Sequence, residues 1–158
     1  MTSAYSLHTD GGARGNPGPA GIGVVLQSPD GEVVTEIGKG IGWATNNVAE
    51  YEGLIAGLQA ARNAGVSELD VFMDSTLVIE QMKGRWKVKH PGLKPLHAKA
   101  RKLAGEFDHI RFKAVPRAQN KQADRLSNEG MDAWEAENPG FQPDTYRAAE
   151  NYLQYTMK

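Results

Sequence analysis

Residues 5–40 read YSLHTDGGARGNPGPAGIGVVLQSPDGEVVTEIGKG, and they decide the fold class. Three segments of this stretch are rich in apolar and β-branched residues, as strands are: Tyr5–Asp10, Ile22–Gln27 and Val33–Gly40. The Asp30-Gly31 pair suits the positive φ of a tight hairpin turn. Gly11–Gly21, which contains two prolines, is expected to be a turn-rich loop. The stretch therefore predicts an antiparallel meander.

Beyond residue 45 the apolar period changes to that of a helix, with one stripe formed by Val48, Tyr51, Leu54, Ile55, Leu58 and Ala61. Asn46 or Asn47 can cap this helix, and Gly65 can end it. The remaining elements are expected as strand Leu69–Asp74, helix Thr76–Met82, a basic connection Lys83–Pro95, helix Leu96–Phe107, strand Ile110–Val115 and helix Asn120–Trp134. This order predicts an α/β fold with a five-stranded mixed sheet, three antiparallel strands and then parallel ones, flanked by helices.

The length of 158 residues fits a single domain, expected over residues 1–136. Asn138-Pro139-Gly140 breaks the chain, and the tail 137–158 is expected to pack on the same domain, with a short helix over Asp144–Tyr155. The absence of cysteine excludes disulfides and zinc–thiolate sites. No apolar run can span a bilayer, and the first residues do not resemble a signal peptide. We expect a soluble, cytoplasmic monomer with no obligate protein partner.

The formal net charge is −1, but 13 of the 18 basic residues lie between Lys83 and Arg125. The same segment holds only three acidic residues, Glu106, Asp108 and Asp124. Such asymmetry is typical of a surface that meets a polyanion. It is equally compatible with a solvated helix face that balances acids elsewhere, so the charge distribution alone does not distinguish between these two interpretations.

Four carboxylates are expected at one edge of the sheet. Asp10 and Asp74 end two strands that the helical crossover makes parallel neighbours. Glu50 and Asp124 each lie one turn into a helix that can reach the same edge. Clustered carboxylates repel one another and favour a hard cation such as Mg²⁺ or Mn²⁺. Two such ions about 4 Å apart can hold the attacking water and the leaving oxygen of a phosphodiester.

Each acid also has a plainer explanation. Asp10 precedes Gly-Gly and could be a turn former, while Asp74 could cap the following helix. Glu50 could belong to a capping box, and Asp124 could pair with Lys121 or Arg125. The metal-site interpretation rests on all four acids falling at the appropriate element ends together.

Four segments together resemble a known family. Thr9–Gly21, Thr45–Tyr51, Asp74-Ser75 and Asn120–Asp124 are similar, in this order, to the four motifs of type 1 ribonuclease H. The resemblance extends from about Tyr5 to Trp134. It implies a ribonuclease H-like fold and endonucleolytic hydrolysis of the RNA strand of an RNA–DNA hybrid, with 5′-phosphate and 3′-hydroxyl products. Double-stranded RNA is a conceivable side substrate, because it too is A-like and offers 2′-hydroxyls.

The resemblance also implies roles for individual residues. Asp10 would bridge two Mg²⁺ ions, for which Mn²⁺ can substitute. Asp124 would bind the ion that activates water, and Glu50 and Asp74 the ion on the leaving-group side. Three polar residues would contact the hybrid: Asn16 and Asn46 in the minor groove, and Thr45 at a phosphate of the DNA strand.

The sequence departs from the family's better-known bacterial members in two places, as in its archaeal-like branch. The loop before Asp124 has no histidine, and Arg117 is our candidate to support catalysis there, although arginine cannot shuttle protons. Lys83–Pro91 is too short for the family's basic protrusion. We expect this loop to hold the DNA strand through Trp86, Lys87 and Lys89. Trp86 could equally anchor the loop in the core.

Three other functions compete with this one. A binding module that has lost its chemistry would bind hybrid without cutting it. A nuclease of the same fold acting on DNA would have no use for residues that contact ribose at Asn16 and Asn46. A nucleotide-binding enzyme would need a Gly-Lys-Ser/Thr ending in the glycine-rich loop, which is absent.

Overall fold

The computed structural model describes residues 3–141 of the chain. Its elements are β1 (Tyr5–Ala13), β2 (Gly18–Gln27), β3 (Val33–Ala44), α1 (Asn46–Asn63), β4 (Glu68–Met73), α2 (Thr76–Met82), α3 (Lys94–Ala104), β5 (His109–Ala114), a 3-10 turn (Arg117–Gln119) and α4 (Lys121–Glu137). The strand order is β3-β2-β1-β4-β5. The first three strands pair antiparallel, and β4 and β5 are parallel to β1. The predicted five-stranded mixed sheet is confirmed.

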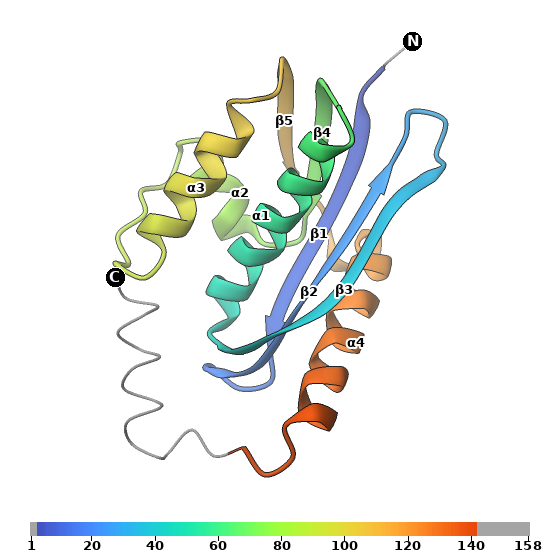
Figure 1. The fold of residues 1–158 in the computed structure, drawn as a ribbon. Helices are drawn as coiled ribbons and strands as arrows, with labels where there is room; N and C mark the ends of the chain where they lie inside the picture. Colours follow the sequence, from blue (N-terminus) through green and yellow to red (C-terminus); the bar gives the residue numbers. More distant parts are fainter. Residues whose placement is uncertain (1–2, 142–158) are drawn as a thin grey trace.

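Helices cover both faces of the sheet (Figure 1). α1, α2 and α3 lie on one face, where Leu7, Val71, Tyr51 and Leu58 are fully buried in the main core. On the other face α4 packs on β1, β2 and β3. No helix within residues 3–141 is long and apolar enough to cross a membrane.

The predicted loop Gly11–Gly21 was wrong, because β1 and β2 pair across most of it, up to Ala13 opposite Ala20. Gly11 and, in β2, Gly23 serve helix packing, whereas Gly15, with a φ of +111°, lies in the short connection between β1 and β2. A Cβ on Gly11 would lie 2.1 Å from the Ala49 carbonyl oxygen of α1, and one on Gly23 would lie 1.9 Å from the Ala123 carbonyl oxygen of α4. Glycine at these positions lets both helices approach the strand backbone closely.

Several boundaries also differ from those predicted. β3 continues past Gly40 to Ala44, with irregular pairing near Ala20, and α3 begins at Lys94. Beyond α4 the chain turns back, and the Phe141 ring lies 5.3 Å from the rings of both Trp43 and Trp134. The predicted helix Asp144–Tyr155 lies outside the described residues.

Candidate active site

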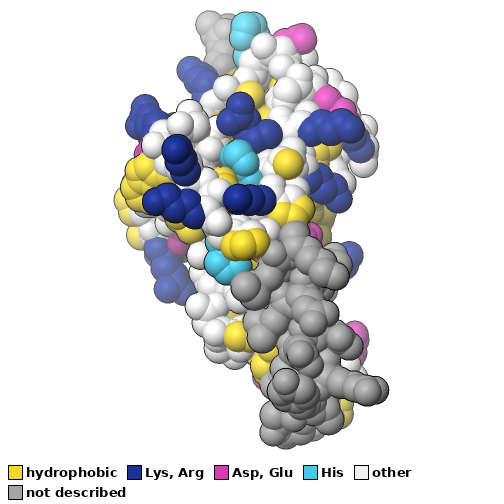
Figure 2. All heavy atoms as spheres, turned by 90° about the vertical axis from the view of Figure 1, so that its left-hand side faces the viewer, with side chains coloured by type: hydrophobic (Ala, Val, Ile, Leu, Met, Phe, Trp, Pro, Cys, Tyr) yellow, Lys and Arg dark blue, Asp and Glu magenta, His cyan; other side chains and the backbone are white. Residues whose placement is uncertain are grey.

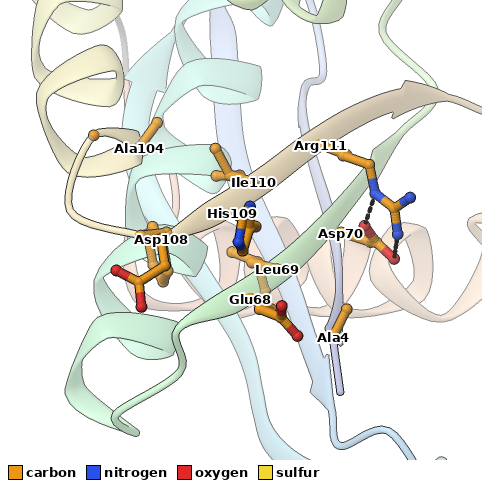
Figure 3. Close-up of a pocket in the computed structure, with 11 residues that line it drawn as sticks. Ala4, Glu68, Leu69, Asp70, Ala104, Asp108, His109, Ile110 and Arg111 are labelled. Atoms are coloured by element: carbon orange, nitrogen blue, oxygen red, sulfur yellow. Dashed lines mark hydrogen bonds and ion pairs between the residues drawn. The ribbon is translucent and has the colours of Figure 1, made fainter. Parts of the chain in front are cut away.

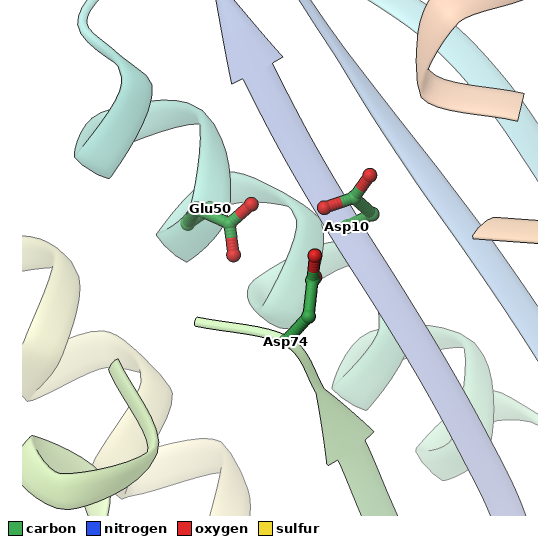
Figure 4. A group of neighbouring side chains, drawn as sticks. All are labelled: Asp10, Glu50 and Asp74. Carbon is green, nitrogen blue, oxygen red and sulfur yellow. The ribbon is translucent and has the colours of Figure 1, made fainter. Parts of the chain in front are cut away.

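Three carboxylates converge where β1 continues past the carboxyl end of β4; Asp10 was expected to end its strand but lies within β1, which extends to Ala13. Asp10, Glu50 and Asp74 each offer an oxygen, and these oxygens all lie within 4.8 Å of one another. Figure 4 shows the side chains pointing toward a common point from β1, from α1 and from the residue that follows β4. The predicted convergence of these three acids is present because β1 and β4 are adjacent and parallel.

The plainer explanations for these acids do not hold. Asp10 lies inside β1, opposite Gly23, and not in a turn. Glu50 Oε1 accepts a hydrogen bond of 3.0 Å from the Gly11 amide, so this side chain reaches across to β1 instead of closing a capping box. Asp74 does not cap α2, because Ser75 Oγ accepts the bond from the Val78 amide at 3.3 Å.

Asp124 lines the same cleft as these three acids but stands slightly apart from their group. The cleft has a volume of about 290 Å³. Asp124 pairs with neither Lys121 nor Arg125. Instead Arg117 Nη2 lies 3.4 Å from Asp124 Oδ1, while Arg125 pairs with Glu129. The structure thus places Arg117 beside the fourth acid, with its side chain 76% exposed.

The electrostatics of the group favour a cation. Burial, followed by repulsion from Asp74 and Asp124, raises the pKa of Asp10 to about 7. Burial and the charge of Asp10 raise the pKa of Glu50 well above its ordinary value. Within the described chain, Glu50 Oε2 is buried without any hydrogen-bond partner. A buried oxygen without a partner, in an all-carboxylate group, fits a hard divalent ion such as Mg²⁺.

Two residues that support the site were not predicted. Asn120 is buried, and its Nδ2 donates to the Thr9 carbonyl oxygen at 2.9 Å and to Asp74 Oδ1 at 3.1 Å. Ser127 Oγ lies 3.2 Å from Asp10 Oδ2. An asparagine before a helix looks in sequence like a cap, but Asn120 makes no capping bond. The sequence gives no signal for Ser127, because its partner is 117 residues away.

The predicted substrate residues divide into two groups. Asn46 lines the cleft, and its backbone N–H donates to Asn16 Oδ1 at 3.0 Å, so these two residues are held together at the rim. Thr45, rather than Asn46 or Asn47, caps α1, with its Oγ1 accepting from the Val48 amide at 3.2 Å.

The second group, Trp86, Lys87 and Lys89, does not line the cleft. Trp86 is 48% exposed, so the alternative of a core anchor is wrong. Lysine and arginine side chains gather on this side of the molecule, with hydrophobic side chains between them (Figure 2).

Comparisons with known proteins agree with this geometry. Residues 8–130 match the family model described as reverse transcriptase-like. A bifunctional protein of Mycobacterium tuberculosis is 56% identical over 128 residues, which are 80% of this chain and 35% of that protein. The solved structure of its N-terminal RNase H domain matches with a TM-score of 0.79, covering 81% of this chain and 98% of that one.

Ribonuclease HI of Halobacterium salinarum is 48% identical over 78% of this chain and 62% of its own length. The crystal structure of LC11-RNase H1 in complex with RNA/DNA hybrid matches with a TM-score of 0.78 and 45% identity, covering 82% of this chain and 97% of that one. The present chain spans about a third of the M. tuberculosis relative.

Proposed function

Because this chain belongs to the type 1 ribonuclease H family, within the wider reverse transcriptase-like group, we propose that it is an endonuclease that cuts the RNA strand of RNA–DNA hybrids. The products would be 5′-phosphate and 3′-hydroxyl ends. The observation that carries the proposal is the Asp10–Glu50–Asp74 group with its unpartnered Glu50 oxygen. The similarity to a ribonuclease H1 crystallised with RNA/DNA hybrid supports the choice of substrate.

The four acids would hold two divalent ions, Mg²⁺ or Mn²⁺, which supply Lewis acidity and lower the pKa of an attacking water. Asp10, at the centre, would serve both ions, with Asp124 on the water side and Glu50 and Asp74 on the leaving-group side. Arg117, exposed beside Asp124, can hold a phosphate oxygen at this edge.

Selection of the RNA strand would come from the rim of the cleft. The amides of Asn16 and Asn46 can donate to and accept from ribose 2′-hydroxyls, which DNA lacks. The α1 start at Thr45 presents backbone amides that suit a phosphate. Trp86, Lys87 and Lys89 would hold the DNA strand further along the duplex. We propose that residues 1–136 form the catalytic unit and that it acts as a monomer.

Cleavage of a hybrid with an end-labelled RNA strand tests the proposal, in Mg²⁺ and in Mn²⁺, for the wild type, Asp10→Asn and the surface control Asp30→Asn. Single-stranded RNA, double-stranded RNA and double-stranded DNA are the matched substrates. Internal RNA cuts that need metal and disappear only in Asp10→Asn are expected. Binding of hybrid without cutting would instead identify a non-catalytic module, and cutting of DNA would identify a DNA nuclease of the same fold.

A further inference from the structure

The edge strand β5 is bordered by a groove that lies outside the catalytic cleft. Two adjoining hollows share the lining residues Lys83, Arg111 and Phe112. One, of about 420 Å³, is also lined by Asp70, Phe72 and Lys113. The other, of about 710 Å³, adds residues of α2, of α3 and of the segments that follow them, among them Met82, Arg85 and Arg101. We call the two hollows together the β5 groove.

Positive charge dominates the β5 groove. Five cations line it: Lys83, Arg85, Arg101, Arg111 and Lys113. Arg111 forms a two-pronged ion pair with Asp70, at 2.7 and 3.0 Å, and Arg85 lies 3.6 Å from Glu80. Within residues 3–141 the other three cations have no ion pair. The groove is therefore complementary to a polyanion.

Two aromatic rings lie among these cations. Phe112 of β5 is half-buried toward the helices, and Phe72 of β4 is half-buried on the opposite face. The Phe72 ring stacks on His8 with 4.8 Å between ring centroids. Aromatic rings interleaved with cations are the usual composition of surfaces that bind single-stranded nucleic acid, where bases stack and phosphates pair with lysine and arginine.

The groove begins next to the catalytic carboxylates. Phe72 and Lys113 are partners in the β4–β5 register. Asp74 follows Phe72 by two residues, on the same face and about 7 Å further along the chain. Beyond Lys113, the Val115 amide donates to the Met73 carbonyl oxygen, and the chain then reaches Arg117. A strand leaving the cleft therefore meets Phe72 and Lys113 first, and it reaches Phe112 and Arg101 by passing around the edge strand β5.

The opposite end of β5 is unfavourable for a polyanion. The hollow in Figure 3 is lined there by the carboxylates of Glu68, Asp70 and Asp108, with Arg111 occupied by Asp70. This negative end limits the anion path to the part of β5 between Lys113 and Arg111 and to the neighbouring surface of α2 and α3. The path therefore has a direction, from the cleft toward α2 and α3.

We propose that the β5 groove binds a single-stranded segment that continues from the hybrid, so that the preferred substrate is a hybrid with a single-stranded overhang. The inference rests on the proposed function for the identity of the duplex. Both an RNA and a DNA overhang offer the required bases and phosphates, and the experiment distinguishes them. An acidic peptide would satisfy the cations but would bring no bases to stack on Phe72 and Phe112.

The test compares the Kd of a blunt hybrid with that of the same hybrid carrying an RNA or a DNA overhang of roughly eight nucleotides, long enough to follow the groove. Binding is measured by fluorescence anisotropy in EDTA, so that no strand is cut, at several salt concentrations. The variant is Arg101→Ala/Lys113→Ala. The matched control, Lys39→Ala/Arg62→Ala, removes the same charge from β3 and the end of α1.

For the wild type we expect at least one overhang to tighten binding about tenfold. The groove variant should reduce this gain to less than about threefold and lower the salt slope for the overhang substrate by about 1.4, because each of the two lost phosphate contacts releases counterions. The affinity of the groove variant for blunt hybrid should match that of the control variant. Equal Kd values with and without both overhangs, or a gain that persists in the groove variant, would overturn the inference. Cleavage of blunt hybrid in Mg²⁺ reports separately on the proposed function.

Discussion

Asn120 connects the fourth sequence motif to the third, because its Nδ2 lies 3.1 Å from Asp74 Oδ1 and also donates to the Thr9 carbonyl oxygen. The amide thereby fixes the carboxylate that follows β4 relative to the backbone of β1. Asn120 is 2% exposed, so these two hydrogen bonds are shielded from bulk water.

Asn120→Ala should lower kcat by roughly 10- to 100-fold and weaken the apparent Mg²⁺ affinity, because Asp74 loses the group that orients it. Steady-state rates over a Mg²⁺ titration measure both effects. Gln122→Ala, which removes an exposed amide of α4 that donates to Glu36 of β3, is the control and should retain the wild-type rate. Unchanged Mg²⁺ dependence in Asn120→Ala would show that Asp74 needs no such support.

The pH dependence of stability should reveal the buried Asp10. Its pKa of about 7 in the folded state lies above that of an unfolded aspartate, so the folded protein binds more protons between these values. Stability in EDTA should therefore fall as pH rises from about 4 to 7, by on the order of 2–4 kcal/mol. Asp10→Asn should remove this fall in stability with pH. In the wild type, added Mg²⁺ should offset the loss of stability at pH 7.

Denaturant unfolding at pH 4.5 and 7.5 measures the effect, with Glu32→Gln as an exposed control. The same pH dependence in Asp10→Asn and the wild type would contradict the assignment of the shift to Asp10.

Gly11→Ala should damage both stability and activity. The added Cβ would lie 2.1 Å from the Ala49 carbonyl oxygen, so α1 must move away from β1 and carry Glu50 with it. We expect a loss of about 3 kcal/mol in the free energy of unfolding and a large fall in kcat. Gly105→Ala is the control, because its Cβ would meet only ordinary contacts at 3.5 Å or more. Equal melting temperatures for the two variants would refute the close-approach argument.

Arg117→Ala should lower kcat about tenfold without changing stability. The Arg117 side chain is 76% exposed and its ion pair with Asp124 is long, so its contribution to folding is small. Arg125→Ala, which breaks the exposed pair with Glu129 on α4, should leave the rate unchanged. If Arg117→Ala keeps the wild-type rate and pH profile, Arg117 has no part in catalysis.

Trp86→Ala should weaken hybrid binding by about 5- to 100-fold while leaving the melting temperature unchanged, since the ring is half exposed and can stack on a sugar or base. Trp86→Phe should recover part of the affinity. Anisotropy and thermal unfolding of the three proteins measure binding and stability separately, and an unchanged Kd in Trp86→Ala would contradict a role for Trp86 in holding the substrate.

The sequence by itself determined the order of the elements and the identity of the acids. Period-two and period-3.6 patterns depend only on neighbouring residues, so the strands, the main helices and the parallel pairing of β1 with β4 followed from them. Asp10, Glu50 and Asp74 could be predicted as a group because that pairing places strand ends together.

Only the tertiary structure decided what the glycines and the small polar residues do. Gly11 was expected in a loop and Gly23 in a strand, but both lie in strands where a helix backbone comes too close for a Cβ, α1 at Gly11 and α4 at Gly23. Asn120 was expected only as the first residue of a helix, and its side chain bonds to a strand residue 111 positions earlier. The β5 groove likewise combines residues of two strands with the ends of two helices. Neighbouring residues in the sequence do not predict these contacts. Each contact depends on the distance between two elements, and only the packing of the whole chain sets that distance.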